Sequence, residues 1–192
     1  MKKREVSPQK VLICCGGGID SSALIYYYIE RKYIVRAIHF DYGHSAYREE
    51  KKALDAISRY YQIEAFHKKI SPSISNVLNK SGELLGRNAL FLLSALNNLE
   101  NNSGLISIGI HSGTAFYDCS PSFVEHMQLL FDGYCGGTVL LDIPFLTYNK
   151  SDVIMWSREK GVPLKITYSC QKGNKSPCGK CSSCTERKKY GL

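Results

Sequence analysis

Residues 11–22, Val-Leu-Ile-Cys-Cys-Gly-Gly-Gly-Ile-Asp-Ser-Ser, constrain the fold of this chain more than any other stretch. The apolar run from Val11 to Cys15 is typical of a buried strand, and three glycines end it before a helical pattern opens at Asp20. Glycines let backbone N–H groups approach a ligand closely, and the first turn of a helix adds unpaired N–H groups at the positive end of its dipole. This order of elements suits a phosphate or pyrophosphate, and a tight turn that binds nothing is the alternative.

The length and composition predict one compact domain. The chain has 192 residues, of which 44% are hydrophobic and 22% charged, as in ordinary globular proteins. No stretch approaches the roughly 18–20 apolar residues of a membrane span, and no signal-like apolar segment follows Met1-Lys-Lys-Arg. We therefore predict a cytoplasmic protein without a membrane partner. The formal net charge of +8 favours anionic partners such as ATP, pyrophosphate or a nucleic acid.

The remaining chain alternates apolar strand patterns with helical patterns. Further strands are predicted over 34–40, 63–69, 104–110 and 138–143, and helices over 20–32, 48–61, 87–99, 120–131 and 151–160. Residues 71–86 have the composition of a surface loop or a short helix, and the periodicity ends at Thr167. This alternation predicts a doubly wound α/β fold with a mostly parallel, five-stranded sheet and right-handed crossovers.

Ligands of such sheets bind beyond the carboxyl ends of the strands, at the point where the strand order reverses. The rule brings several segments to one edge of the sheet. These are residues 16–20, 41–44, 111–113 and the segment after Pro144. We predict the active site along this rim.

Four cysteines, Cys170, Cys178, Cys181 and Cys184, have the spacing Cys-x7-Cys-x2-Cys-x2-Cys. Four thiolates satisfy tetrahedral Zn²⁺, and a four-thiolate iron–sulfur cluster is the main alternative. A disulfide pair is disfavoured in the reducing cytosol. We predict a structural zinc site that holds residues 167–192 against a domain formed by residues 1–166. Cys14 and Cys15 lie on the first predicted strand and are interpreted as core residues rather than nucleophiles.

The glycine loop resembles the Ser-Gly-Gly-x-Asp-Ser loop of the PP-loop ATP pyrophosphatase superfamily, which has an adenine nucleotide alpha hydrolase-like fold. Gly17, Gly18, Asp20 and Ser21 match that pattern, and Gly16 replaces the first Ser. With the cysteine tail, the chain resembles the 7-cyano-7-deazaguanine synthase (QueC) family. The other matching segments are Phe40-Asp41-Tyr42-Gly43, Gly86-Arg87-Asn88, Ile108-Gly109, Asp118-Cys119, Pro144-Phe145, Lys150, Gly161-Val162-Pro163 and Thr167-Tyr168-Ser169-Cys170.

The resemblance implies an ATP-dependent C–N ligase of queuosine biosynthesis. In that reaction 7-carboxy-7-deazaguanine is adenylated, ammonia converts the adenylate to an amide, and a second ATP dehydrates the amide to the nitrile 7-cyano-7-deazaguanine. The products from ATP are AMP and pyrophosphate, or ADP and phosphate equivalents. ATP with Mg²⁺, structural Zn²⁺ and a homodimer are implied with it.

The resemblance also implies roles for individual residues. Asp20, Lys150 and Arg87 are the implied catalytic residues: Asp20 caps the helix or helps hold Mg²⁺, Lys150 neutralises a terminal phosphate, and Arg87 faces the α-phosphate or the substrate. ATP and substrate are implied to contact Cys15, Gly16, Gly17, Gly18, Asp20, Ser21, Ser22, Asp41, Tyr42, Gly43, Asn88, Gly109 and His111.

Three departures from the family pattern leave the acceptor open. Gly16 removes a hydroxyl from the loop, and His44 stands where the family usually carries Gln. The segment His111-Ser112-Gly113-Thr114 lacks the acidic residue expected there, and the segment up to Asp118 is about one residue short. A divergent member of an antiphage defence system, acting on another acid or a protein, is therefore a second hypothesis. The chain ends soon after the cysteines, so we expect a terminal helix common in the family to be missing.

Two further hypotheses fit the sequence less well. Sulfur insertion into tRNA requires free redox cysteines, whereas the cysteines here are interpreted as metal-bound or buried. A non-catalytic zinc-ribbon module that binds nucleic acid agrees with the basic charge, but the tyrosines at 26–28 are more typical of a helix core than of a base-stacking surface. We therefore expect no stable nucleic-acid partner.

Overall fold

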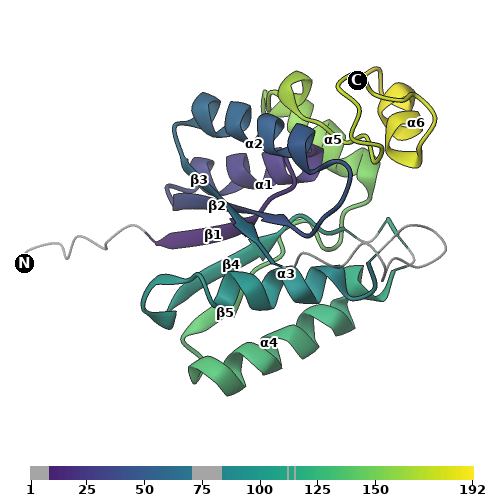
Figure 1. Ribbon diagram of the computed structural model, residues 1–192. Helices are drawn as coiled ribbons and strands as arrows, with labels where there is room; N and C mark the ends of the chain where they lie inside the picture. The colour runs from purple at the N-terminus through teal and green to yellow at the C-terminus, as the bar shows by residue number, and fades with distance from the viewer. Residues whose placement is uncertain (1–8, 71–83, 112, 115) are drawn as a thin grey trace, which may run out of the picture.

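The computed structural model describes residues 9–70, 84–111, 113–114 and 116–192. Its five strands form one all-parallel sheet in the order β3-β2-β1-β4-β5 (Figure 1). The strands are β1 (Lys10–Cys14), β2 (Ile34–Asp41), β3 (Glu64–Lys69), β4 (Gly104–Ile108) and β5 (Val139–Leu141). The helices are α1 (Ile19–Glu30), α2 (Tyr47–Tyr61), α3 (Arg87–Leu96), α4 (Pro121–Cys135), α5 (Lys150–Glu159) and α6 (Ser182–Lys189). The predicted doubly wound α/β fold is confirmed.

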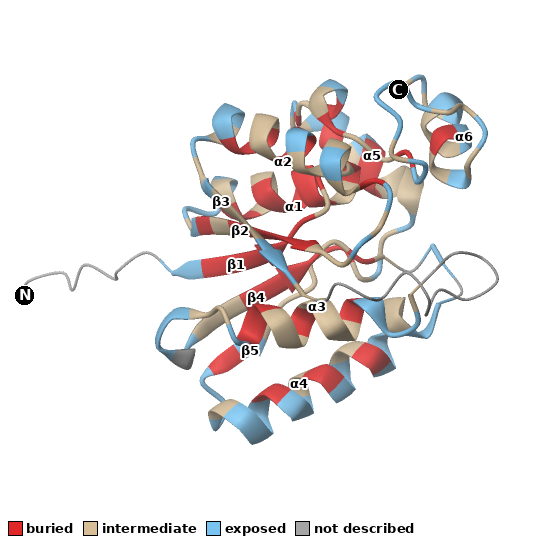
Figure 2. Ribbon diagram, in the orientation of Figure 1, coloured by how far each residue is buried: buried red, intermediate tan, exposed pale blue. Residues whose placement is uncertain are grey.

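Helices cover both faces of the sheet, with α1, α2 and α5 on one side and α3 and α4 on the other (Figure 1). Successive residues of β1 point to opposite faces, as the pleat of a strand requires. Val11 and Ile13 pack against the α1 side, whereas Leu12 and Cys14 pack against the α3 side. A strand buried on both faces must be apolar throughout, which explains the unbroken run in the sequence. Figure 2 shows this burial along β1 and β4.

The order of the strands reverses beside β1. From β1 the chain moves outward through β2 to β3, and then crosses back to place β4 on the other side of β1. Cys14 at the end of β1 pairs with Ile38 on β2 and with Ile108 on β4. The glycine loop after β1 therefore lies at the point where the strand order reverses, where open α/β sheets bind their ligands.

The C-terminal segment contains a helix that the sequence did not predict. The periodicity of the sequence ends at Thr167, and no helix was predicted where α6 forms. The helix is short and polar, so it has no apolar periodicity to detect. The Tyr168 N–H donates to the Gly17 carbonyl (2.9 Å), and the Ser45 hydroxyl donates to the Gln171 carbonyl (2.9 Å). These bonds place the tail against the carboxyl edge of the sheet.

Several shorter features complete the fold. In the described part of the chain, 3₁₀ turns span Glu100–Asn102, Tyr117–Cys119 and Leu164–Ile166. Most of the segment predicted as a loop or short helix, residues 71–83, lies outside the described residues. Among the helices that the structure describes, none combines the length and the apolar character needed to cross a bilayer.

Candidate active site

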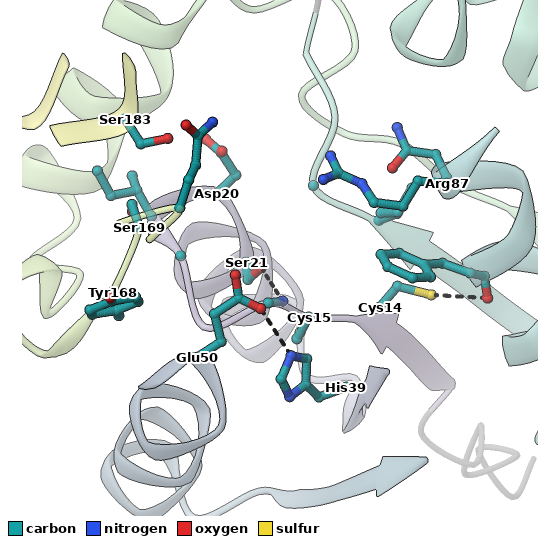
Figure 3. A pocket seen from close by; sticks show the side chains of 18 of the residues that line it. Cys14, Cys15, Asp20, Ser21, His39, Glu50, Arg87, Tyr168, Ser169 and Ser183 are labelled. Atoms are coloured by element: carbon teal, nitrogen blue, oxygen red, sulfur yellow. Dashed lines mark hydrogen bonds and ion pairs between the residues drawn. The ribbon is translucent and has the colours of Figure 1, made fainter. Parts of the chain in front are cut away.

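A cavity of about 310 Å³ opens at the carboxyl ends of β1 and β4 (Figure 3). Its walls come from the glycine loop and the start of α1, from the segment after β2, from the start of α3, and from the C-terminal tail. The lining residues are Cys14, Cys15, Gly16, Gly18, Ile19, Asp20, Ser21, His39, Phe40, Tyr42, Glu50, Arg87, Asn88, Phe91, Ile108, Gly109, Lys150, Tyr168, Ser169, Gln171, Ser183, Glu186 and Arg187. The sequence therefore located the edge of the sheet that carries the cavity.

The glycine loop turns sharply because Gly17 has φ +69°. A Cβ at Gly17 would lie 2.6 Å from the Glu50 carbonyl oxygen on α2, so this glycine permits close packing of the loop on α2. Gly17 does not line the cavity, whereas Gly16 and Gly18 do. The Gly16 N–H donates to the Ser21 hydroxyl (3.2 Å), and Gly18 is the N-cap of α1 without a side-chain cap. The first N–H groups of α1 are therefore available at the cavity.

Asp20 and Lys150 form an ion pair at the cavity wall. Lys150 Nζ donates to both carboxylate oxygens of Asp20, at 2.8 and 2.6 Å, and both side chains are largely buried. Asn149 and Asp152 form a reciprocal capping box that fixes the start of α5 and with it Lys150. The alternative in which Asp20 caps α1 is wrong, because Gly18 occupies the N-cap position and the carboxylate accepts from Lys150.

Gly109 permits the close approach of β4 to this ion pair. A Cβ there would lie 3.0 Å from the Asp20 Cβ, which is tighter than ordinary packing. The segment that follows β4 therefore packs directly against the backbone and Cβ of Asp20.

Arg87 and Asn88 begin α3 across the cavity from the glycine loop (Figure 3). The Asn88 side chain donates to the Asp118 carbonyl (3.0 Å), so it fastens the 3₁₀ turn at Tyr117–Cys119 as well as lining the wall. Burial raises the pKa of Tyr42, and the nearby Arg87 guanidinium opposes that shift. Arg87 thus supplies positive charge opposite the Asp20–Lys150 pair.

A cluster of two histidines and a glutamate lies where β2 meets α2. His39 Nε2 and His44 Nε2 lie 3.2 and 2.7 Å from the same oxygen, Oε2 of Glu50. Burial opposes ionisation of Glu50, but the hydrogen bonds of the two histidines prevail and lower its pKa to about 2. The Glu50 carboxylate is thus a fixed negative charge beside the cavity.

Five residues that the resemblance assigned to the site do not line the cavity: Gly17, Ser22, Asp41, Gly43 and His111. The Ser22 side chain is fully buried. Adjacent residues of an α-helix point in different directions, so Ser22 faces the core while Ser21 faces the cavity. Asp41 Oδ1 accepts from the Gly43 N–H (2.9 Å), which stabilises the turn after β2. His111 Nδ1 accepts from the Gly113 N–H (3.2 Å), and burial lowers its pKa.

The sequence missed the lining residues from α2 and from the tail. Glu50 lies in the charged stretch 48–52, where local patterns give no sign of a cavity, and no periodic signal marks Ser169, Gln171 or Arg187. The half-buried Arg187 guanidinium donates to the Thr167 hydroxyl (2.8 Å) and the Leu164 carbonyl (3.3 Å). Burial lowers its pKa. Its position depends on the folded tail, which local sequence patterns do not reveal.

The sulfur atoms of the four tail cysteines all lie within 4.8 Å of one another. Backbone N–H groups point at the sulfurs: that of Cys178 lies 3.4 Å from Cys170 Sγ, and that of Cys181 lies 3.4 Å from Cys178 Sγ. Such N–H groups stabilise thiolates, and four thiolates form a closed tetrahedral zinc site. The residues therefore fit a structural Zn²⁺ ion, as predicted from their spacing.

Comparison with known proteins identifies the family. The model of the family described as "Queuosine biosynthesis protein QueC" matches residues 10–85 and 80–191, nearly the whole chain. The chain belongs to the QueC family. Among its QueC relatives, 7-cyano-7-deazaguanine synthase from Prochlorococcus marinus subsp. pastoris is 30% identical, with 95% of this chain and 93% of the relative covered. The enzyme of the same name from Methanoregula boonei is 31% identical over 93% of this chain and 92% of its own.

Solved structures share the fold of this QueC family member. NMN synthetase from Francisella tularensis has a TM-score of 0.55 and 16% identity, covering 97% of this chain and 74% of its own. A predicted subunit of tRNA methyltransferase from Methanocaldococcus jannaschii has a TM-score of 0.58 and 11% identity, covering 79% and 76%. At these identities the likeness concerns the fold alone.

Proposed function

We propose that this QueC family member is an ATP-dependent ligase that converts 7-carboxy-7-deazaguanine and ammonia to 7-cyano-7-deazaguanine. One observation carries the proposal: the Asp20–Lys150 pair, the uncapped start of α1 and Arg87 surround a single cavity where the strand order reverses. Unpaired N–H groups and cations on opposite walls suit a nucleotide triphosphate. The QueC family model and the curated relatives support the substrate assignment.

The chemistry requires charge neutralisation more than acid–base catalysis. A carboxylate oxygen of the substrate attacks the α-phosphorus, and the bond to the bridging oxygen breaks, so pyrophosphate leaves with the electron pair. Ammonia then attacks the acyl carbon, AMP departs, and nitrogen loses a proton to give the amide. The amide oxygen then attacks the α-phosphorus of a second ATP, and pyrophosphate leaves. That oxygen departs with AMP as the C≡N bond forms and two protons leave nitrogen.

We propose that residues on different walls of the cavity share the binding and charge neutralisation of the phosphates. The N–H groups at Gly18 and Ile19 hold the pyrophosphate, and Lys150 and Arg87 neutralise charge on the phosphates. When Lys150 moves to a phosphate, the Asp20 carboxylate becomes available to hold Mg²⁺, a cation that prefers oxygen ligands. Removing one preorganised charged donor from such a site typically costs about 10²–10³-fold in rate.

Mass spectrometry of the products tests the proposal. Zinc-loaded protein is incubated with ATP, Mg²⁺, ammonium and 7-carboxy-7-deazaguanine, and nitrile, AMP and ADP are quantified. We expect nitrile with AMP from wild type, and a loss of about 10²-fold or more in Lys150→Met. Lys160→Met is the matched control, because Lys160 pairs with Glu30 on the surface. Absence of nitrile from folded wild type that binds ATP would refute the substrate assignment.

A second candidate keeps adenylation and changes the acceptor to another acid or a protein carboxylate, as in a divergent antiphage role. One observation favours it: His44, which stands where the family usually carries Gln, stacks on the cavity residue Tyr42 with ring centroids 4.0 Å apart. AMP formation that requires a different acid in place of the deazaguanine acid would support this candidate.

The implied homodimer is a separate proposal, which light scattering after size-exclusion chromatography tests directly.

A further inference from the structure

The cluster of His39, His44 and Glu50 shares no residue with the four tail cysteines or with the Asp20–Lys150 pair. One ligand atom from each of its residues lies within 4.8 Å of those from the other two. We propose that these three side chains bind a first-row divalent transition-metal ion, with the cavity supplying its remaining ligands. The inference does not depend on the proposed reaction, because it concerns metal binding by the cluster itself.

The ligand spacing is close to that of a metal site. With metal–nitrogen and metal–oxygen bonds of about 2.1 Å, two ligands of a tetrahedral ion lie about 3.4 Å apart. His39 Nε2 and His44 Nε2 lie 3.2 and 2.7 Å from Glu50 Oε2, so the first pair must open by about 0.2 Å and the second by about 0.7 Å. A shift of this size is within the reach of side-chain rotation.

The surrounding residues hold the imidazoles in place. Tyr47 stacks on His39 with an interplanar angle of 18°, and Tyr42 stacks on His44 at 11°. His39 Nδ1 faces His67 Nδ1 at 3.4 Å, and His67 Nε2 lies 2.9 Å from Asp55 Oδ1. Metal-binding histidines characteristically use the second ring nitrogen in such a chain of hydrogen bonds, which orients the ring and sets its tautomer.

The tautomer of His39 decides which neighbour receives its hydrogen. With hydrogen on Nε2, neutral His39 donates to the Glu50 carboxylate at 3.2 Å. With hydrogen on Nδ1, it donates to His67 Nδ1, and His67 Nε2–H donates to Asp55. A metal ion between His39 Nε2 and Glu50 takes the place of the hydrogen on Nε2 and favours the second tautomer, which His67 and Asp55 can accommodate.

The same reasoning predicts an exchangeable ion. His44 Nδ1 is buried and makes no hydrogen bond in the described part of the chain, so neutral His44 carries its hydrogen on Nε2 and donates it to Glu50. Coordination through Nε2 moves that hydrogen to Nδ1, where it lacks an acceptor. This cost weakens the site, and we expect a mild chelator to empty it while the four-thiolate site stays loaded.

The ligand types select the class of ion. Two imidazoles and one carboxylate suit Zn²⁺, Fe²⁺, Co²⁺ or Ni²⁺, whereas Mg²⁺ prefers oxygen ligands alone. His39 and Glu50 line the cavity, and His44 lies behind them. An ion held here therefore has coordination positions directed at whatever occupies the cavity.

Metal content and cobalt spectra test the inference. The full chain with its thiolate site filled by Zn²⁺ is titrated with Co²⁺, and bound metal is counted by elemental mass spectrometry after gel filtration. Wild type is expected to bind one Co²⁺ in addition to Zn²⁺, with a visible spectrum that lacks thiolate charge-transfer bands. His44→Gln and Glu50→Gln are expected to lose the Co²⁺. His67→Asn is expected to retain it with about 10–100-fold weaker affinity.

His126→Asn is the matched control, because His126 pairs with Tyr117 on the exposed face of α4. It is expected to bind Co²⁺ as wild type does, and thermal unfolding checks that each variant folds. If wild type binds no Co²⁺ beyond the thiolate site, or if His44→Gln binds it with unchanged affinity, the inference is wrong. His44→Gln keeps Glu50 paired with His39, so it tests the site even if Glu50→Gln fails to fold.

Discussion

The packing of the glycine loop on α2 predicts that two adjacent glycines respond very differently to alanine. Gly17 has φ +69°, a conformation that costs an alanine about 1–2 kcal/mol. The new Cβ would also lie 2.6 Å from the Glu50 carbonyl oxygen and 3.0 Å from the Ala53 Cβ. Backbone cannot yield as a flexible side chain does, so overpacking adds about 1–3 kcal/mol. We expect Gly17→Ala to lower the free energy of unfolding by about 2–5 kcal/mol in total.

Gly16→Ala is the internal control. Its Cβ would lie 3.8 Å from the nearest atom, Oε2 of Glu50, which is an ordinary contact. Alanine restricts the unfolded chain similarly at both positions, so the difference between the variants isolates the effect on the folded state. Urea unfolding of the zinc-loaded proteins measures this difference, and a shift of about 4–20 °C in Tm accompanies it. If the variants agree within about 0.5 kcal/mol, the loop can leave α2 without cost and the packing argument is refuted.

Three further predictions concern the supports of the cavity. Asn149→Ala removes the capping box that positions Lys150 and should cost about 0.5–2 kcal/mol in chemical denaturation, whereas Asn97→Ala, at the exposed end of α3, should cost less. Cys178→Ser opens the four-thiolate site, so limited proteolysis should cut within residues 167–192 at least tenfold faster than in wild type; equal rates would show that the tail packs without metal. Burial lowers the pKa of His111, so the unfolded state binds its proton first as pH falls. The stability of wild type should therefore decrease below about pH 6.5 more steeply than that of His111→Asn, and parallel curves would contradict this reasoning.

Local patterns were sufficient to predict the strands and helices of the sheet, because each β-α unit is formed by one continuous segment of the chain. The apolar run of β1 and the glycines after it were visible in the sequence, and the alternation of elements predicted a parallel, five-stranded sheet, whose strand order the structure supplies. The bounds differ by up to four residues, at α4, whose predicted end at 131 extends to Cys135. Helix α6 was missed because a short polar helix has no periodicity to detect.

The site was predicted only in part, because its walls come from segments far apart in the chain. Asp20, Arg87 and Lys150 follow strands or begin helices at the carboxyl edge, and the fold brings them to one cavity as expected. Ser22 was expected at the ligand, but its side chain is buried and does not line the cavity, because the Ser-Ser pair does not reveal which side of α1 faces the sheet. Gly17 matched a phosphate-loop pattern, but its conformation and its packing on α2 also require glycine.

The four cysteines are linked to the cavity because residues beside them in the tail line its wall. Tyr168 and Ser169 directly precede Cys170, Ser183 lies between Cys181 and Cys184, and all three of these non-cysteine residues line the cavity. An ion held by the cysteines fixes both ends of this wall. Arg187 follows one helical turn after Cys184 and reaches back to the Leu164 carbonyl, which joins the wall to the main domain. A closed four-thiolate site touches no substrate, so its effect on catalysis must come from holding these side chains at the cavity. Loss of that ion should therefore weaken nucleotide binding even though the glycine loop, Asp20 and Lys150 remain.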